Sequence, residues 1–187
     1  MAKIEIVRRY VYLWFSILAS HPGKRLVYID GFAGPGEYTN NVQGSPLAAL
    51  AAAKDALERP GSGLQSKECC FLFVEKRRKF AAHLRALISK TTWPPQFKWE
   101  VVEGTFEEQV GGILEQFKSG RQQLAPTFAF IDPFGATGLP FKVVADILSG
   151  AGDGVGDGKD FLRLVLGRAD PRMDPKGSRS LEHFCSV

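Results

Sequence analysis

The feature that most constrains the fold is a short apolar segment that ends on a carboxylate and runs directly into a glycine-dense loop. It reads VYIDGFAGPG over residues 27–36. Glycine has no side chain, so its backbone can approach a ligand where any Cβ would collide. At the carboxyl end of a first strand, an open α/β sheet holds nucleotide-like ligands in this kind of loop. The segment therefore predicts a parallel α/β sheet with a ligand site at one edge.

Strand-like and helical patterns alternate along the rest of the chain. Short apolar runs predict strands, and longer segments with apolar residues at helical spacing predict helices. This alternation indicates an α/β fold with right-handed crossovers. Ser45 is predicted to cap one helix, with Pro46 as its first residue. Strands are predicted at residues 26–29, 70–74, 97–102 and 127–131, and helices at residues 47–57, 78–88, 106–117 and 141–148.

The N-terminal segment predicts an amphipathic helix rather than a cleaved leader. Basic residues precede an apolar stretch at residues 11–19, which on its own resembles a secretory signal. However, Glu5 interrupts the basic part, and the apolar run is too short to cross a bilayer. We expect the helix to pack on the sheet through residues at helical spacing, namely Ile4, Val7, Val11, Trp14, Phe15 and Leu18.

Composition favours a soluble protein in a reducing compartment. The chain has 187 residues, 44% of them hydrophobic, which is enough for a substantial core. Its net charge of +4 permits a nucleic-acid partner without arguing for one. Cys69, Cys70 and Cys185 lack the spacing of metal ligands, and the adjacent pair does not suit a structural disulfide. We therefore expect a cytoplasmic protein without a metal site or a membrane span.

The character of the sequence changes after residue 148. Residues 149–158 are glycine-rich and predict a flexible linker, and residues 161–166 suggest a fifth strand. We divide the chain into a Rossmann-like domain at residues 1–150 and a linker with an atypical tail, a candidate for disorder, at residues 151–187. The expected architecture is a three-layer αβα sandwich whose mostly parallel sheet is incomplete at its C-terminal side.

Each of the four predicted strands ends on a carboxylate, and glycine follows closely in three of them. The spacing of roughly 30 to 45 residues matches the length of a strand–helix unit. Because the carboxyl ends of parallel strands meet at one edge, these residues predict a shared site. A carboxylate after the second strand suits the ribose hydroxyls of an adenosine. The four strand ends are Asp30-Gly31, Glu75, Glu103-Gly104-Thr105 and Asp132-Pro133-Phe134-Gly135.

Three other interpretations of these residues stay open. The glycine loop is also compatible with an ordinary structural turn, and Glu75 with a charged start of the next helix. A dinucleotide oxidoreductase is less compatible, because its Gly-x-Gly-x-x-Gly fingerprint opens directly into a helix. Here a long loop separates Gly36 from Pro46. His83 is predicted to be a structural residue near the apolar face of its helix.

These motifs resemble the S-adenosylmethionine (SAM)-dependent methyltransferases of the Rossmann-like class. More narrowly, residues 28–36, 44–46 and 130–135 resemble the three-Cys-motif partner family, TcmP, of bacteria and archaea. The match covers about residues 1–150. The resemblance implies that residues of the glycine loop wrap the methionine part of SAM, that Glu75 binds its ribose and that Thr105 lies beside the adenine. The implied cofactor-binding residues are Asp30, Gly31, Phe32, Ala33, Gly34, Gly36, Glu75, Gly104 and Thr105.

The same resemblance implies the catalytic residues. Asp132, Pro133 and Phe134 stand where amino-methyltransferases carry Asp/Asn-Pro-Pro-Tyr/Phe, whose carboxylate and carbonyl accept hydrogen bonds from an exocyclic amine. This sequence differs because a single proline is followed at once by Phe134 and Gly135. The alternative is that Asp132 only contacts the cofactor or caps a following helix.

Two functions follow as expectations. The first is a SAM-dependent methyltransferase that acts on a nucleic-acid base or another amine, with the base flipped into the site if the substrate is a duplex. The second is a non-catalytic Rossmann-like protein that docks onto a partner. The resemblance implies that this partner is the three-Cys-motif protein of radical-SAM appearance for which the family is named. The residues quoted above do not identify the methyl acceptor or the oligomeric state.

Overall fold

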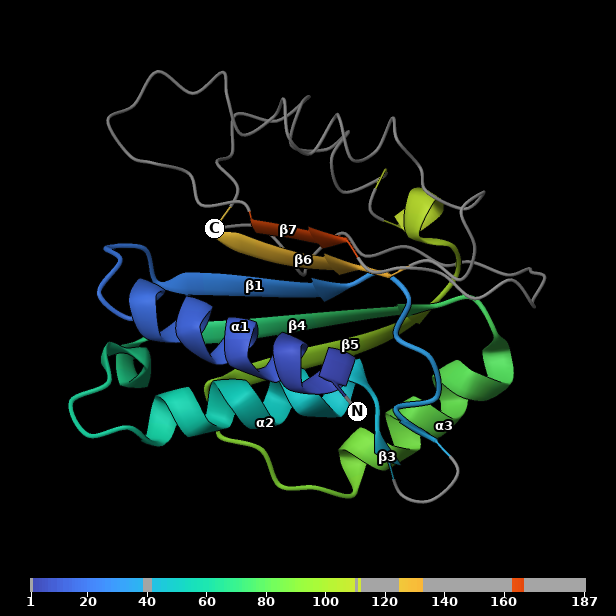
Figure 1. The fold of residues 1–187 in the computed structure, drawn as a ribbon, viewed down its shortest axis with the longest axis horizontal. Coiled ribbons are helices and arrows are strands. Elements are labelled where there is room, and N and C mark those ends of the chain that lie inside the picture. Colours follow the sequence, from blue (N-terminus) through green and yellow to red (C-terminus); the bar gives the residue numbers. More distant parts are fainter. Residues whose placement is uncertain (1, 39–41, 110, 112–124, 133–162, 167–187) are drawn as a thin grey trace.

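The fold is built on a four-stranded parallel sheet. A computed structural model describes residues 2–38, 42–109, 111, 125–132 and 163–166 of the chain. The strands are β1 (Arg25–Asp30), β4 (Glu68–Glu75), β5 (Phe97–Glu103) and β6 (Thr127–Ile131), in the spatial order β5-β4-β1-β6. All three pairings between them are parallel, and their arrowheads lie on the same side in Figure 1. The predicted α/β fold and its four strands are therefore confirmed.

A fifth strand extends the sheet beyond β6. This strand, β7 (Arg163–Leu166), pairs with β6 in parallel, with Phe128 opposite Arg163. It lies within the predicted fifth strand at residues 161–166. In the order β5-β4-β1-β6-β7, the chain first adds β4 and β5 on one side of β1. It then crosses back and adds β6 and β7 on the other side.

The inner strands β1, β4 and β6 are apolar on both faces, as is typical of buried parallel strands. The edge strand β5 is less buried and carries the exposed Lys98. Seven of the eight residues of β4 are buried, and so are all five residues of β6. On one face, aromatic side chains of neighbouring strands pack together. The rings of Tyr28 and Phe128 are stacked with centroids 5.7 Å apart, and Phe71 packs 6.0 Å from Tyr28. This aromatic layer fixes the relative positions of β4, β1 and β6.

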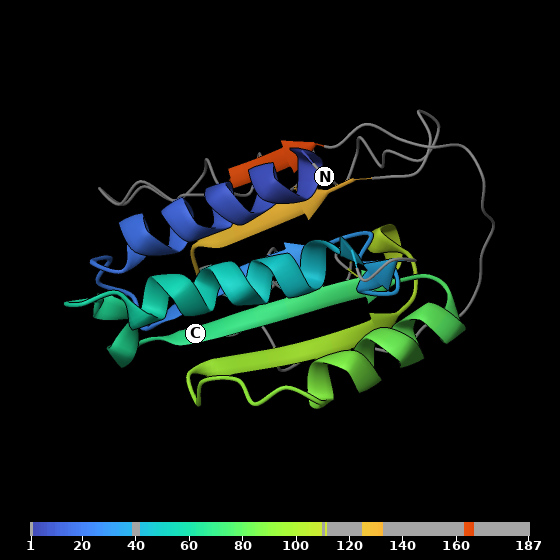
Figure 2. The same cartoon turned by 60° about the horizontal axis from the view of Figure 1, so that its bottom comes forward.

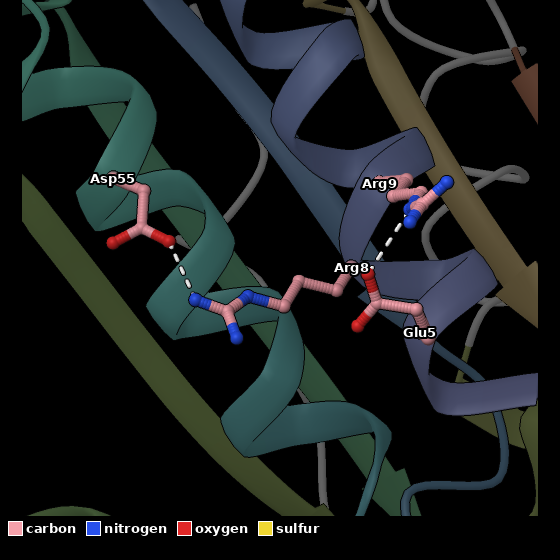
Figure 3. A network of polar contacts seen from close by, with 4 residues as sticks. All are labelled: Glu5, Arg8, Arg9 and Asp55. Carbon is pink, nitrogen blue, oxygen red and sulfur yellow. Dashed lines mark hydrogen bonds and ion pairs between the residues drawn. The ribbon is translucent and has the colours of Figure 1, made fainter. Parts of the chain in front are cut away.

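Helices α1 (Ala2–Leu18) and α2 (Ser45–Glu58) pack against each other and cover this aromatic face (Figure 2). The predicted amphipathic N-terminal helix is confirmed, although Ile4 is only partly buried. An ion pair of 2.8 Å links Arg8 of α1 to Asp55 of α2 (Figure 3). Both side chains are about half exposed, so this pair contributes little compared with the apolar contacts. The buried residues of α1 are Val7, Val11, Trp14, Phe15 and Leu18.

The start of α2 differs from the prediction. Ser45 was expected to be the N-cap, but the cap is Gly44, which has extended dihedrals and provides no side-chain hydrogen bond. Pro46 lies within the first turn, where its missing N–H costs nothing. The shift matters because it leaves the Ser45 hydroxyl free of a capping role.

Helix α3 (Arg78–Ser89) packs on β4 and β5 through Ala81, Leu84 and Ile88. His83 does not lie on the apolar face of its helix as predicted, and its structural role stays a prediction. Its side chain is half exposed, and its Nε2 lies 3.2 Å from Oε1 of Glu37. His83 is exposed although its neighbour Leu84 is buried, because adjacent helical residues do not share a face.

A short antiparallel hairpin was not predicted. It consists of β2 (Glu37–Tyr38) and β3 (Val42–Gln43) and follows the glycine loop. A further 3-10 turn, η1 (Gly63–Ser66), lies before β4. Two-residue strands are too short to show an alternating pattern in the sequence, which explains why this segment resembled a loop.

Several predictions fall outside the described residues. They include the helix at residues 141–148, the second helical layer of the sandwich, most of the helix at residues 106–117, and the tail at residues 167–187 with Cys185. Within the described part, residues 106–109 are helical. No helix in the described ranges is long and apolar enough to cross a membrane.

Candidate functional site

The carboxyl ends of the parallel strands bring the predicted site residues to one edge of the sheet. Asp30, the last residue of β1, is paired with Phe73 of β4 on one side and with Phe130 of β6 on the other. Glu75 ends β4 and is paired with Glu103 at the end of β5. The sheet order reverses between β1 and β6, so this edge also contains the topological switch point where ligands bind in such sheets.

The glycine loop at residues 31–36 is held across the ends of two strands. Backbone hydrogen bonds join the Gly31 N–H to the Phe130 carbonyl, at 2.9 Å, and the Ala33 N–H to the Val74 carbonyl, at 3.0 Å. The loop is therefore anchored to β6 at its start and to β4 two residues later. This arrangement gives the loop a defined position over the edge of the sheet.

Two glycines are required by the geometry of this loop. A Cβ on Gly31 would lie 2.5 Å from the ring of Phe106, which itself packs on the ring of Phe32 with centroids 6.1 Å apart. Gly36 has a φ of +84°, and a Cβ there would lie 2.5 Å from Cδ1 of Leu84. The N–H of Gly44 donates to the Gly36 carbonyl at 2.7 Å, which closes the hairpin behind the loop. The loop thus has no room for a side chain at Gly31 or Gly36.

Asp30 is the most unusual titratable group of the site. Its side chain is fully buried, and its Oδ1 accepts a hydrogen bond of 3.2 Å from the Phe32 N–H. Oδ2 has no hydrogen-bond partner of acceptable geometry among the residues that the structure describes. The pKa of Asp30 is raised to about 7, mainly by burial and to a smaller extent by the charges of Asp132 and Glu75. Hydrogen bonding with the Ser45 side chain and the Phe32 N–H offsets part of this effect on the pKa.

Glu75 connects the glycine loop to the end of β4. Its Oε2 accepts the Gly34 N–H and its Oε1 accepts the Arg77 N–H, both at 2.8 Å. Burial raises the pKa of Glu75, while these two hydrogen bonds act in the opposite direction. Each oxygen retains a second lone pair, so a ribose role stays a prediction. The observed role is structural, because one carboxylate fixes both the loop and the start of α3.

The end of β5 forms the start of the next helix. Thr105 and Glu108 make a capping box, in which the Glu108 N–H donates to Oγ1 of Thr105 and the Thr105 N–H donates to the Glu108 carboxylate. The Gly104 N–H donates to the carbonyl of Glu75 at 3.1 Å, which joins this turn to β4. Contact between Thr105 and an adenine ring stays a prediction, since the polar groups seen here serve the helix.

Two further residues of the site were missed from the sequence. The hydroxyl of Tyr38 in β2 lies next to the glycine loop. A Cβ added to Gly34 would be 3.3 Å from the hydroxyl oxygen. Burial raises the pKa of Tyr38, and so do the charges of Asp30, Asp132 and Glu75. Ser45 approaches Asp30 from the first turn of α2. In the sequence, only the position of Tyr38 and Ser45 shortly after the glycine loop indicated a place in the site.

The end of β6 contributes one predicted catalytic residue to this group. Asp132 is partly buried and lies close enough to Asp30 and Tyr38 to shift their pKa values. Pro133 and Phe134 lie outside the described residues. No group of three or more His, Cys, Asp or Glu side chains suited to a metal ion occurs in the described part of the chain.

The arrangement therefore combines a tightly packed glycine loop with three neighbouring carboxyl groups and a tyrosine, all at the switch point of a parallel sheet. Phe32, Ala33 and the glycines of the loop shape the backbone, and Asp30, Glu75 and Asp132 supply the charge. Such an edge suits a ligand that has both hydrogen-bonding and positively charged groups. The chain matches no protein-family model, and no curated protein is significantly similar to it.

Proposed function

We propose that this chain is a SAM-dependent methyltransferase domain of the Rossmann-like class, with a three-layer αβα architecture. One observation carries the proposal: a glycine loop and a buried carboxyl group lie together where the sheet order reverses between β1 and β6. In open α/β sheets this position holds nucleotide-like ligands. The resemblance to the TcmP family points to SAM among such ligands.

The residues present fit a bound SAM in two respects. The glycine loop is held at the switch point of the sheet by backbone hydrogen bonds to β6 and β4, which fixes its backbone where a ligand of this class would lie. The Oδ2 of Asp30 is buried and has no hydrogen-bond partner in the described residues, so it is available to a polar or charged ligand group. SAM supplies an activated methyl group on a sulfonium. In the proposal Asp30 and the loop hold its methionine part, Glu75 its ribose, and Gly104 and Thr105 its adenine.

The methyl acceptor is proposed to be an amine, either on a nucleic-acid base or on another molecule. Support comes from the similarity of Asp132, Pro133 and Phe134 to the Asp/Asn-Pro-Pro-Tyr/Phe motif of amino-methyltransferases. In this proposal the Asp132 carboxylate accepts a hydrogen bond from the amine and orients it toward the methyl group, and the Phe134 ring stacks on the acceptor. Alignment of this kind supplies most of what methyl transfer requires from a protein. A cytoplasmic location is part of the same proposal.

A specific observation favours a second candidate, the docking protein. The helix α1 carries exposed apolar residues one and two turns apart, and Ile6, Leu13 and Ile17 are each at least half exposed. They lie on the side of α1 away from its buried face and would suit an apolar partner surface. The resemblance suggests a three-Cys-motif protein as this partner.

Calorimetric titration of the full chain with SAM tests the first proposal. Binding that is lost in Asp30→Ala and kept in Asp55→Ala would support it, because Asp55 is a surface carboxylate on α2. Circular dichroism and cooperative urea unfolding establish that each variant is folded. Absence of SAM binding by a folded parent chain would refute the methyltransferase proposal. Binding of the three-Cys-motif protein, lost in Leu13→Asp, would then support the docking function.

A further inference from the structure

Three carboxyl groups from three different segments meet beside the glycine loop. Asp30 ends β1, Glu75 ends β4, and Asp132 follows β6. Glu75 and Asp132 both act on the charge of Asp30, and all three act on the Tyr38 hydroxyl. The hydrogen bond from Gly34 to Glu75, and the position of the Tyr38 hydroxyl next to Gly34, place Glu75 and Tyr38 together independently of their charges. Asp30 is fixed beside the same loop by the hydrogen bond from the Phe32 N–H.

Asp30 differs from Glu75 because its charge is compensated only in part, by the Phe32 N–H and the Ser45 side chain. Both oxygens of Glu75 accept backbone N–H groups. The Oδ2 of Asp30 is buried and has no such donor within the described residues, and no basic side chain is among the groups that act on it. A buried carboxylate without a partner is costly, and a positive charge beside it would remove that cost. The unpaired oxygen therefore points to a ligand rather than to a purely structural role.

Tyr38 adds an aromatic surface to this group. It belongs to the β2–β3 hairpin, and 46% of its surface is exposed although its hydroxyl lies over Gly34. The face of a tyrosine ring attracts cations, and this attraction adds to that of carboxylates. Carboxyl groups with an aromatic ring beside them form a favourable environment for an organic cation.

We propose that Asp30, Glu75, Asp132 and Tyr38 form a cation-selective site, so that the chain binds the positively charged sulfonium of SAM more tightly than the neutral thioether S-adenosylhomocysteine. This inference rests on the proposed function, because it concerns the same edge of the sheet. Its functional consequence is release of the product. After the methyl group has left, the ligand loses the charge that the three carboxyl groups attract.

Charge selectivity of this kind has a consequence for protons. With a pKa of about 7, Asp30 is partly protonated at neutral pH before a cation binds. A cation favours the ionised carboxylate, so its binding releases a proton and its affinity increases from pH 6 to pH 8. The other groups that face Asp30 include Tyr28 of β1, Glu75 from β4 and Asp132 after β6. Tyr38 and Ser45 face it from the segment after the loop. S-adenosylhomocysteine keeps the α-ammonium group but lacks the sulfonium charge, so we expect its affinity to change less with pH.

The test compares SAM and S-adenosylhomocysteine by calorimetric titration of the full chain at pH 6, 7 and 8. At pH 8 we expect SAM to bind about tenfold more tightly than S-adenosylhomocysteine, in line with one ion pair of moderate burial. At pH 6 we expect the ratio of the two affinities to fall toward one. Repeating the SAM titration at pH 7 in buffers of different ionisation enthalpy should show release of a proton. Asp132→Asn should lower the ratio, and Tyr38→Leu should lower it more than Tyr38→Phe.

Asp55→Asn is the matched control, because it removes one carboxylate from the exposed surface of α2. It should leave the affinity ratio unchanged. Equal affinities for both ligands at all three pH values would refute the cation-selective site and leave the proposed function intact. If neither ligand binds to the folded chain, the proposed function fails and this inference fails with it. Measurements on the parent chain suffice for this decision even if one variant does not fold.

Discussion

Replacing Gly36 by alanine should destabilise the folded chain through one defined contact. The residue has a φ of +84°, and an added Cβ would lie 2.5 Å from Cδ1 of the buried Leu84. Gly61 provides a matched control, since its φ is +74° and a Cβ there would have no atom within 4 Å. The two substitutions share the backbone penalty and differ in the collision with α3.

The expected magnitudes follow from these two components. A left-handed conformation costs an alanine about 1–2 kcal/mol, and the smaller conformational freedom of the unfolded chain returns about 0.4–1 kcal/mol. Gly61→Ala should therefore lower the free energy of unfolding by about 1 kcal/mol. Overpacking against Leu84 should add about 1–3 kcal/mol for Gly36→Ala, because the Leu84 side chain is fully buried and has little room to move.

Urea denaturation of the parent and both variants, followed by circular dichroism, measures these differences. A double-mutant cycle with Leu84→Ala tests the cause, since removal of the Leu84 side chain should make Gly36→Ala cost no more than Gly61→Ala. Equal losses for Gly36→Ala and Gly61→Ala in the parent background would refute the packing argument.

Three further predictions concern polar groups. Thr105→Ala should lower the free energy of unfolding by about 1 kcal/mol through loss of the capping box, and urea denaturation showing no loss would contradict this role. Lys67→Met should cost about 1–3 kcal/mol in the same assay, because the buried Nζ donates to the carbonyls of His21 and Gly23; an unchanged midpoint would show that these bonds add no stability. The pKa of Asp30 is 3.8 in the unfolded chain and about 7 in the folded chain, so the folded chain holds this proton more tightly. The free energy of unfolding should therefore fall as the pH rises through this range. Unfolding measured from pH 4 to pH 8 should show a smaller fall for Asp30→Asn, and an equal or larger one would contradict the raised pKa.

The order of strands and helices was predictable because both depend on local patterns. The continuous apolar run of β4 and the helical spacing of apolar residues in α1 each indicate which residues are buried. The hairpin of β2 and β3 was not predictable, since its strands are only two residues long and the hydrogen bond from Gly44 to Gly36 that continues it leaves no pattern in the sequence. His83 was misplaced because one helical position separates a buried residue from an exposed one.

The site was predictable in its location but not in its internal contacts. Carboxylates at the ends of parallel strands had to meet at one edge, and Asp30, Glu75 and Asp132 do so. That Glu75 would hold Gly34, and that Thr105 would cap a helix, depends on side-chain orientations that no local pattern encodes. Tyr38 enters the site through the hairpin and could not be found before the hairpin was known.

The central position of β1 also determines when the sheet can be completed during synthesis. Val27 pairs with Cys70 on one side and with Thr127 on the other. On the ribosome, β1 and β4 can pair long before residues 127–131 have emerged, and during that interval one side of β1 is an unpaired apolar edge. Such edges readily pair with other chains. One side of β1 therefore stays open to pairing with other chains until β6 has been synthesised.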